Sequence, residues 1–367
     1  MKYKCLLPLA LFLIFSTAKA QKDTIGKQKK ISITPLPVLI NDPFIGFGYG
    51  AIVNTNFLMG EAATTRYSNA QAFVMKTTRG QLQMQLNHIL FLNNEDWMIQ
   101  GKFQYLNFPE FTYGLGGNTS ADTPSKERVS YKAFEFEERV MRRIGNKNFI
   151  GLQFRLYDCW NLSSDIIPQR SFFDSAAVGN KSFIALGIGV HFIHDSRDNV
   201  QNAYRGHYLE VAVNPFPKFL GSTQNWTNIR IDARNYVMLN TDESHAHVLA
   251  SRILYEQAVG DPPFMLTPMT GRYFSTRGYV QGRYRGKQFF TAESEYRAPL
   301  WRFIGYVAFV NIQSVSQPNG GFQYIRPGGG GGLRFMLTKA QRTNLRVDYA
   351  TGVKGNSGLY LQVTEVF

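Results

Sequence analysis

The sequence predicts an all-β protein, a transmembrane antiparallel β-barrel of about sixteen strands. Its segments alternate between apolar and polar side chains, as strands do that have lipid on one face and water on the other. Aromatic residues make up 14% of the chain and suit the aromatic girdles of a membrane barrel. After Phe15 no apolar run approaches the roughly 18 residues that a spanning helix needs, so a membrane-embedded chain must close into a barrel.

The chain opens with the features of a secretory signal peptide over residues 1–20. A basic start is followed by an apolar run to Phe15, and Ala18-Lys19-Ala20 has the form of a cleavage site. Residues 21–30 are polar and basic, and they are too few to form a domain. We therefore expect a signal peptide, a short polar lead-in, and a barrel of the bacterial surface-antigen type over residues 31–367.

Alternation and turn residues divide the barrel region into strands. The expected strands are 31–40, 44–58, 66–78, 81–92, 96–108, 129–144, 148–162, 182–194, 207–215, 224–239, 245–259, 288–300, 302–315, 326–337, 342–350 and 358–367. The ranges 129–144 and 245–259 alternate poorly, which predicts a β-bulge in each.

The connections between these strands fall into two classes. If the first strand runs outward, the long connections all lie on the extracellular side, at 109–128, 163–181, 260–287 and 316–325. The turns at 93–94, 145–147, 299–301 and 338–341 are short and lie on the periplasmic side. Outer-membrane barrels separate long loops from short turns in this way, so the connections support an even strand count.

A Gly- and Arg-rich stretch in the longest connection precedes two informative strands. The stretch carries Arg277-Gly278-Tyr279. In the strand after it, Glu293, Glu295 and the other odd positions are polar, which predicts that they face the lumen. The next strand turns Phe309 and Asn311 to the same side.

These residues resemble the signature region of the outer-membrane assembly-factor superfamily, whose members include BamA, TamA and the two-partner secretion translocators. The resemblance rests on the Arg-Gly-Tyr tripeptide, the E-x-R-x-P-L strand and the F-x-N strand. It also rests on Asp195-Ser196-Arg197-Asp198-Asn199 followed by Gly206, which is similar to a D-x-R-D-N stretch at a periplasmic turn in that superfamily. The alternative for this last stretch is an ordinary polar turn.

The resemblance implies a long extracellular loop that folds back into the lumen and rests its arginine on the barrel wall. Arg277 would stack on Phe309. In the family pattern this cation also pairs with an Asp that lies two residues after the aromatic residue, but here the residue two after Phe309 is Asn311. We therefore expect Glu293 or Glu295 to supply the negative charge, and Asn311→Asp to be neutral or stabilising.

The expected last strand ends on Phe367, the form of terminal strand that outer-membrane insertion machinery reads. The prediction is that Phe367 is an insertion signal and that this protein is itself a client of that machinery. The alternative is an ordinary closing strand.

Catalytic and metal-binding patterns are weak. The carboxylates Glu293 and Glu295 are better explained as part of a neutralised charge ladder in a wet lumen than as an acid-base pair. His245 and His247 lack a third metal ligand, and the run Gly328 to Gly332 lacks the Lys-Ser/Thr of a phosphate loop. We expect no enzymatic activity, no cofactor and no metal.

The chain has 40 Lys and Arg against 26 Asp and Glu, a formal net charge of +14. Because the basic residues are spread rather than clustered, anionic lipids and lipopolysaccharide are expected contacts and nucleic acid is not.

The resemblance implies a role at the bacterial outer membrane, in the insertion or translocation of proteins, with nascent outer-membrane proteins as partners. The weak seam between the first and last strands would be the working element. The assembly factors carry periplasmic POTRA domains, which the ten-residue lead-in cannot supply, so we expect a member without them or one served by a periplasmic partner in trans. The alternatives are a passive channel or structural barrel without assembly activity and, less favoured, an outer-membrane lipase.

Overall fold

The computed structural model describes residues 31–42, 46–61, 64–119, 126–165, 173, 179–271, 276–318, 320–339, 342–353 and 355–367. The expected signal peptide and lead-in lie outside these residues.

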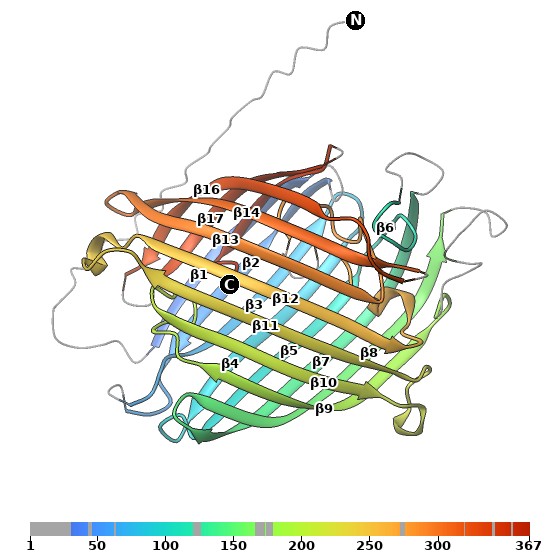
Figure 1. Ribbon diagram of the computed structural model, residues 1–367, viewed down its shortest axis with the longest axis horizontal. Helices are drawn as coiled ribbons and strands as arrows, with labels where there is room; N and C mark the ends of the chain where they lie inside the picture. Colours follow the sequence, from blue (N-terminus) through green and yellow to red (C-terminus); the bar gives the residue numbers. More distant parts are fainter. Residues whose placement is uncertain are drawn as a thin grey trace, which may run out of the picture. The chain divides into compact units, whose positions relative to one another are not determined.

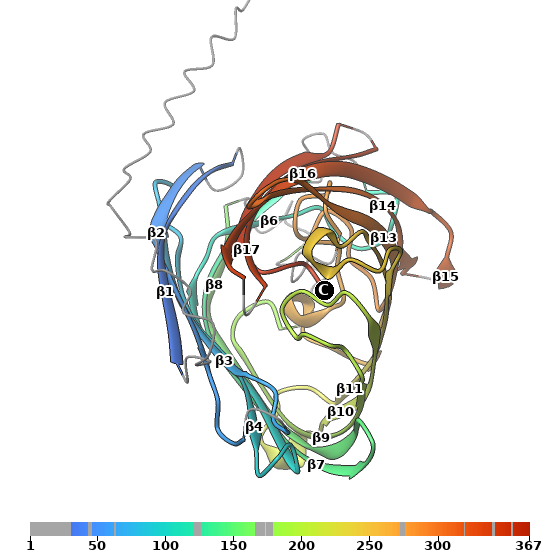
Figure 2. The same cartoon turned by 90° about the vertical axis from the view of Figure 1, so that its left-hand side faces the viewer.

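Sixteen strands form a nearly closed antiparallel barrel with almost no helix (Figures 1 and 2). Each is paired with the next along the chain. They are β1 (Ile31–Asp42), β2 (Gly46–Phe57), β3 (Ser68–Thr77), β4 (Leu82–Leu92), β5 (Trp97–Asn107), β7 (Glu127–Gly145), β8 (Asn148–Ser164), β9 (Phe183–Asp195), β10 (Gly206–Phe216), β11 (Trp226–Met238), β12 (Val248–Gly260), β13 (Gln288–Trp301), β14 (Ile304–Gln317), β16 (Arg326–Thr338), β17 (Thr343–Gly352) and β18 (Ser357–Val363). The predicted fold class is confirmed.

Short elements lie in the connections. Two of them are three-residue strands. β6 (Glu110–Thr112) pairs with the first residues of β7, and β15 (Gly320–Phe322) pairs with the last residues of β14. Three single-turn 3₁₀ helices are η1 (Lys218–Leu220), η2 (Glu243–His245) and η3 (Phe264–Leu266). No helix in the described part of the chain is long and apolar enough to cross a membrane.

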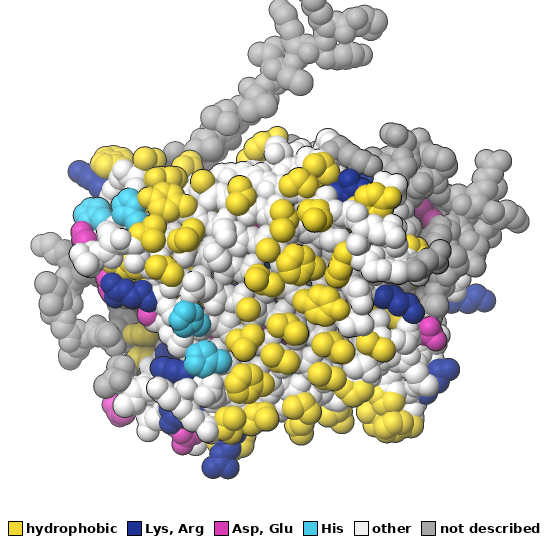
Figure 3. All heavy atoms as spheres, in the orientation of Figure 1, with side chains coloured by type: hydrophobic (Ala, Val, Ile, Leu, Met, Phe, Trp, Pro, Cys, Tyr) yellow, Lys and Arg dark blue, Asp and Glu magenta, His cyan; other side chains and the backbone are white. Residues whose placement is uncertain are grey.

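Alternation along the strands separates an apolar outer face from a polar inner face. On β14, Val310 is 67% exposed whereas its neighbours Phe309 and Asn311 are each 3% exposed. The same alternation places large hydrophobic side chains on the outside of the wall, where they cover much of the face seen in Figure 3, while charged side chains gather toward the two ends. A band of this kind matches the hydrocarbon layer of a membrane.

The structure corrects one predicted bulge and two predicted strand boundaries. A register shift between Arg143 and Gly145 leaves Ile144 as an extra residue in β7, where a bulge was expected, but β12 pairs with both neighbours without a shift, so the second predicted bulge is wrong. The poor alternation came from taking His245 as strand, whereas β12 begins at Val248. The last strand ends at Val363 rather than Phe367, because Thr364 adopts a left-handed φ of 76° that turns the chain out of the sheet.

The barrel has one seam, between β18 and β1. Every other pair of strands that are neighbours along the chain is joined by an antiparallel register, in places with a local shift, but within the described residues β1 is registered only with β2 and β18 only with β17. Figure 2 shows β1 and β2 standing away from the strands at the other end of the chain. The strands on the far side of this seam, β13 to β18, carry the candidate functional site.

Candidate functional site

The longest described connection runs from residue 261 to 287, between β12 and β13, with residues 272–275 outside the described part. It packs on itself through backbone bonds: Thr270 N–H donates to Tyr284 O, and Gly282 N–H donates to Thr270 O. Gly271, Gly278 and Gly282 all have positive φ, which lets the backbone turn sharply on either side of Arg277.

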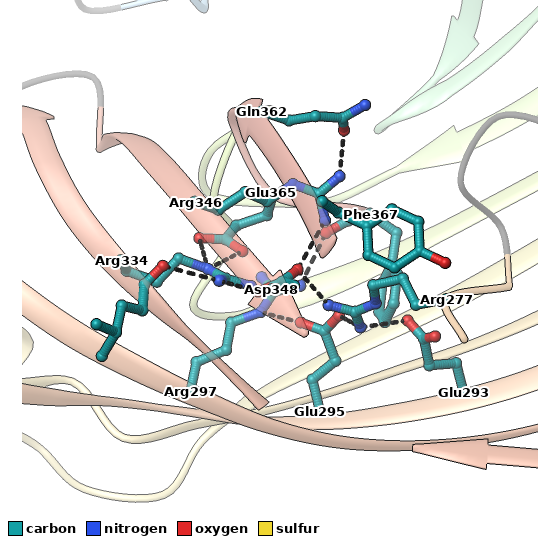
Figure 4. Close-up of polar contacts among 12 residues, drawn as sticks. Arg277, Glu293, Glu295, Arg297, Arg334, Arg346, Asp348, Gln362, Glu365 and Phe367 are labelled. Atoms are coloured by element: carbon teal, nitrogen blue, oxygen red, sulfur yellow. Dashed lines mark hydrogen bonds and ion pairs between the residues drawn. The ribbon is translucent and has the colours of Figure 1, made fainter. Parts of the chain in front are cut away.

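Arg277 is fully buried. Its guanidinium lies 3.5 Å from the centroid of the Phe309 ring, a close cation–π arrangement. Its Nη2 donates to Glu293 Oε1 at 2.7 Å and also to Glu295 Oε1, and its Nη1 donates to Asp348 Oδ2 at 2.9 Å (Figure 4). The connection is thereby bonded to inner-face side chains of β13, β14 and β17.

Arg277 belongs to a balanced group of buried charges, which we call the Arg277 cluster. The cluster consists of Arg277, Arg297, Arg334, Arg346, Glu293, Glu295, Asp348 and Glu365. Burial opposes the charge of Arg277, but Glu295, Glu293 and Asp348 outweigh burial and raise its pKa above the usual value. Arg277 is therefore a permanent cation, and removing it would leave three carboxylates without their shared partner.

Asn311 is close to Arg277 but does not bond to its guanidinium. Its Nδ2 donates to the backbone carbonyl of Arg277 at 3.1 Å and faces Glu293 Oε2 at 3.4 Å. The side chain thus acts as a donor toward two acceptors. The negative charge that the family pattern places here comes from Glu293, Glu295 and Asp348 instead.

Glycines make room for Tyr279 against the wall. A Cβ on Gly352 would lie 2.5 Å from Tyr279 Cζ, and a Cβ on Gly328 would lie 3.2 Å from Tyr279 Cε2. The Tyr279 hydroxyl donates to Pro327 O at 2.5 Å, and Val353 N–H donates to that hydroxyl at 3.2 Å. Gly328 of β16 and Gly352 of β17 therefore leave the space that the Tyr279 ring occupies against the sheet.

Gly278 links the same tripeptide to the last strand. Its N–H donates to the hydroxyl of Tyr360 on β18 at 2.9 Å. All three residues of the predicted loop motif thus contact the wall between β13 and β18.

A second set of contacts holds the other end of the connection. Arg285 is fully buried, and its Nη2 donates to Glu110 Oε1 on β6 at 3.0 Å. Arg283 donates to the hydroxyl and the carbonyl of Thr119, both at 2.8 Å. The connection is therefore fixed to the neighbouring connection that follows β5 as well as to the wall.

The predicted turn motif closes the hairpin of β9 and β10. Arg197 makes a two-pronged ion pair with Asp195, at 2.8 and 3.1 Å. Asp198 accepts from the backbone N–H of Tyr204 at 2.9 Å. Gly206 has a φ of 108°, and a Cβ there would lie 2.4 Å from Ser196 O, so only glycine fits. These contacts build a rigid turn.

Phe367 turns inward instead of ending the sheet. Its backbone oxygen accepts from Arg297 Nη2 at 3.0 Å, and its ring centroid lies 6.4 Å from that of Tyr236. Arg297 of the Arg277 cluster therefore also holds the last residue of the chain.

Two contacts of the long connection, those with Asp348 and Tyr360, were not predicted from the sequence. The alternation from Arg342 to Ala350 indicates that Asp348 lies on the polar face of its strand. Alternation does not show which strands the long connection crosses, so it could not pair Asp348 with Arg277. Within the described residues, no group of three or more His, Cys, Asp or Glu is placed to hold a metal ion.

A family model described as the Omp85 superfamily domain matches residues 47–362. The chain belongs to the Omp85 superfamily. The match spans nearly the whole barrel, including the 261–287 connection and the strands that it contacts. Membership makes this protein a bacterial outer-membrane barrel, as the sequence predicted.

Solved structures agree with this fold. BamA from Haemophilus ducreyi lacking POTRA domains 1–3 matches with a TM-score of 0.55 and 12% identity, over 92% of this chain and 69% of that chain. CdiB from Acinetobacter baumannii matches with a TM-score of 0.58 and 10% identity, over 92% of this chain and 60% of that one. CdiB from Escherichia coli matches with a TM-score of 0.56 and 6% identity, over 92% and 63%. This Omp85 chain thus spans about three fifths of the length of either CdiB.

A search of curated proteins found no match.

Proposed function

We propose that this Omp85 barrel takes part in the insertion or translocation of polypeptides at the outer membrane, without enzymatic activity of its own. In this proposal the 261–287 connection folds back into the lumen and Arg277 holds it there. The observation that carries the proposal is the burial of Arg277 between Phe309 and three carboxylates. A buried cation with this many partners is costly to displace, so it fixes one position of the connection.

The location of this contact supports a working role. Arg277, Gly278 and Tyr279 bond to β13, to β17, to the start of β16 and to Tyr360 of β18, the strand that borders the seam. A connection bonded to the last strands stabilises one side of the seam while the other side stays unpaired. Outer-membrane lipid and lipopolysaccharide would surround the barrel, nascent outer-membrane proteins would be its substrates, and a periplasmic partner in trans could deliver them.

Depletion of the protein followed by quantitative proteomics of the outer membrane tests this role. The proposal predicts that other β-barrels decline selectively while lipoproteins stay constant. Re-expression of the wild-type chain should restore them. An unchanged set of barrels would contradict the proposal.

A passive channel is the second candidate, and one observation favours it. A cavity of about 250 Å³ lies along the inner faces of β5 and β7 to β12, beneath Leu266 and Pro268 of the long connection. Charged side chains including Lys102, Arg139 and Glu256 line it, so it suits water and ions. A channel would leave the outer-membrane proteome unchanged on depletion while changing the uptake of small solutes.

A further inference from the structure

Basic side chains gather at one end of the wall formed by β3, β4, β5 and β7. The register across these strands sets Lys76, Leu82, Asn107 and Lys132 in one row, because each is paired with the next. More cations lie beyond this row, in the turn after β3 and at the start of β7. We call the basic residues of this region the rim patch: Lys76, Arg79, Lys126, Arg128 and Lys132.

The side chains of the rim patch that lie on strands point away from the lumen. Lys76 follows Val74 by two residues on β3, and Lys132 precedes Phe134 by two residues on β7. Val74 is 40% exposed and Phe134 is 38% exposed, on the outer face. Side chains two apart on a strand share a face, so Lys76 and Lys132 also lie on the outer face of the wall, as does Arg128.

Aromatic and apolar side chains mark the level of the patch in the membrane. The next row, two residues deeper, consists of Val74, Met84, Tyr105 and Phe134. Trp160 of β8 is paired with Lys132, and its ring centroid lies 6.4 Å from that of Tyr105. Tyr and Trp of membrane barrels concentrate where hydrocarbon meets headgroups. The rim patch therefore lies at the membrane–water boundary, directly above an apolar surface.

A hollow adjoins the patch. The turn after β3, the start of β6 and Arg128 enclose a cavity of about 570 Å³ whose lining includes Arg79 and Phe111. Arg128 Nη2 donates to Arg79 O at 3.3 Å, and Lys126 Nζ lies 4.1 Å from the centroid of the Phe111 ring. The cations thus border a space that can receive a polar headgroup.

The charge of the patch is not balanced, in contrast to that of the Arg277 cluster. Within the described residues, Lys76, Arg128 and Lys132 form no ion pair. Two carboxylates lie nearby: Asp165 accepts from the backbone N–H of Arg128 at 2.9 Å, and Asp158 lies on the outer face of β8. Five cations against two carboxylates leave a surplus of three positive charges. Such a surplus at a membrane surface attracts anionic headgroups.

We propose that the rim patch is a binding site for one molecule of lipid A, the phosphorylated glucosamine lipid of lipopolysaccharide. Its phosphate and sugar groups would contact the cations and enter the hollow, and its acyl chains would lie along Val74, Met84 and Phe134. The site faces the outer leaflet because the 109–128 connection is assigned to the extracellular side. This inference goes beyond the proposed role in insertion or translocation and does not depend on it.

The width of the patch favours lipid A over an ordinary phospholipid. Lys76 and Lys132 are separated by three strand spacings, which is roughly 14 Å of wall. A single phosphodiester headgroup reaches only part of this row. A phosphorylated disaccharide that carries several acyl chains can cover both the row of cations and the apolar row beneath it.

Lipid binding by purified full-length protein in detergent micelles, measured by native mass spectrometry, tests the site. The probes are lipid A, the same lipid A after its phosphates are removed, phosphatidylglycerol and inorganic phosphate. The site variant combines Lys76→Gln, Arg128→Gln and Lys132→Gln. The matched control combines Lys181→Gln, Lys218→Gln and Lys287→Gln, three exposed lysines at the same end of the barrel, beside β9, β10 and β13.

We expect one lipid A to bind the wild type and the control equally, and the site variant to bind it roughly tenfold or more weakly. Removing the phosphates from lipid A should have a similar effect. Equal loss in the two variants, or equal binding of dephosphorylated lipid A, would overturn the proposal. Phosphatidylglycerol that binds as tightly as lipid A, or inorganic phosphate that displaces lipid A at equal concentration, would also overturn it, in favour of a general anion site.

Photo-crosslinking in vesicles locates the bound lipid independently. The vesicles contain lipid A as a minor component in phosphatidylcholine, and the crosslinking residue replaces Met84 beneath the patch or Val259 at the same end of β12. These side chains are similarly exposed, at 48% and 46%. Lipid A adduct should be several-fold greater at Met84, and the site variant should lower it to the level at Val259. Equal adduct at the two positions in the wild type would contradict a defined site.

Discussion

Asp348 of β17 accepts a hydrogen bond from Arg277 across 71 residues of sequence, with 2.9 Å between Oδ2 and Nη1. Both side chains are fully buried. Asp348 also bonds to Arg334 and Arg346, so the loop arginine joins a network that spans β13, β16 and β17. The long connection is therefore bonded to the strands next to the seam, and changes in this contact should alter the stability of that side of the barrel.

Asn311→Asp should destabilise the barrel, contrary to the sequence-based expectation. The amide of Asn311 donates to Arg277 O and faces Glu293 Oε2 at 3.4 Å, so a carboxylate would meet two acceptors. We expect a loss of about 1–3 kcal/mol in the free energy of unfolding, measured in urea on semi-native gels. Adding Glu293→Gln should recover part of the loss. A variant as stable as the wild type would show that the amide is not needed as a donor.

Gly352→Ala should weaken the packing of Tyr279. The new Cβ would lie 2.5 Å from Tyr279 Cζ, and the ring cannot shift without breaking its bond to Pro327 O. We expect a cost of about 1–3 kcal/mol and faster proteolysis within the 261–287 connection. The control is Gly320→Ala, which meets no atom within 4 Å. Equal proteolysis of the two variants would mean that Tyr279 is not seated as described.

Deletion of residues 270–285 should open the barrel. If the connection occupies the lumen, the wild-type protein in planar bilayers should show small, flickering conductance. The deletion should give a larger and steadier pore, because the cavity along β5 to β12 would join the freed space. Identical conductance before and after deletion would place the connection outside the lumen.

The two ends of the barrel should face different compartments. Epitope tags at Gly320, in the connection after β14, and at Asn146, in the turn after β7, lie at opposite ends of antiparallel strands. The Gly320 tag should be accessible on intact cells and the Asn146 tag only after permeabilisation. The reverse pattern would invert the assigned topology.

Much of the barrel could be predicted from the sequence because the pattern of side chains that specifies a membrane strand is local along the chain. Lipid on one face and water on the other impose an alternation of apolar and polar side chains with a period of two residues. The alternation is clear in the polar residues Thr291, Glu293, Glu295 and Arg297. The end of β13 was therefore predicted to within one residue. The end of β18 was not predictable in this way. The alternation continues to Phe367, but the left-handed backbone at Thr364 interrupts the strand.

Contacts between segments that are distant along the chain could be predicted only in part from the sequence. The sequence suggested Phe309 and the two glutamates as neighbours of Arg277 because they share strand faces near it. Asp348 and Tyr360 depend on how far the connection reaches across the sheet, which no periodicity encodes.

The thermal stability of Arg277→Ala is the most direct test of the central claim that this arginine holds the connection against the wall. The readout is the temperature at which the folded band on a semi-native gel converts to the unfolded band. Removing the cation leaves Glu293, Glu295 and Asp348 buried together, so we expect a loss of about 3–5 kcal/mol. Phe309→Ala should also lower the conversion temperature, and the control Arg205→Ala, in an exposed ion pair with Glu243, should not. If Arg277→Ala and Phe309→Ala both convert at the wild-type temperature, the connection is not held by this arginine and the proposed function loses its structural basis.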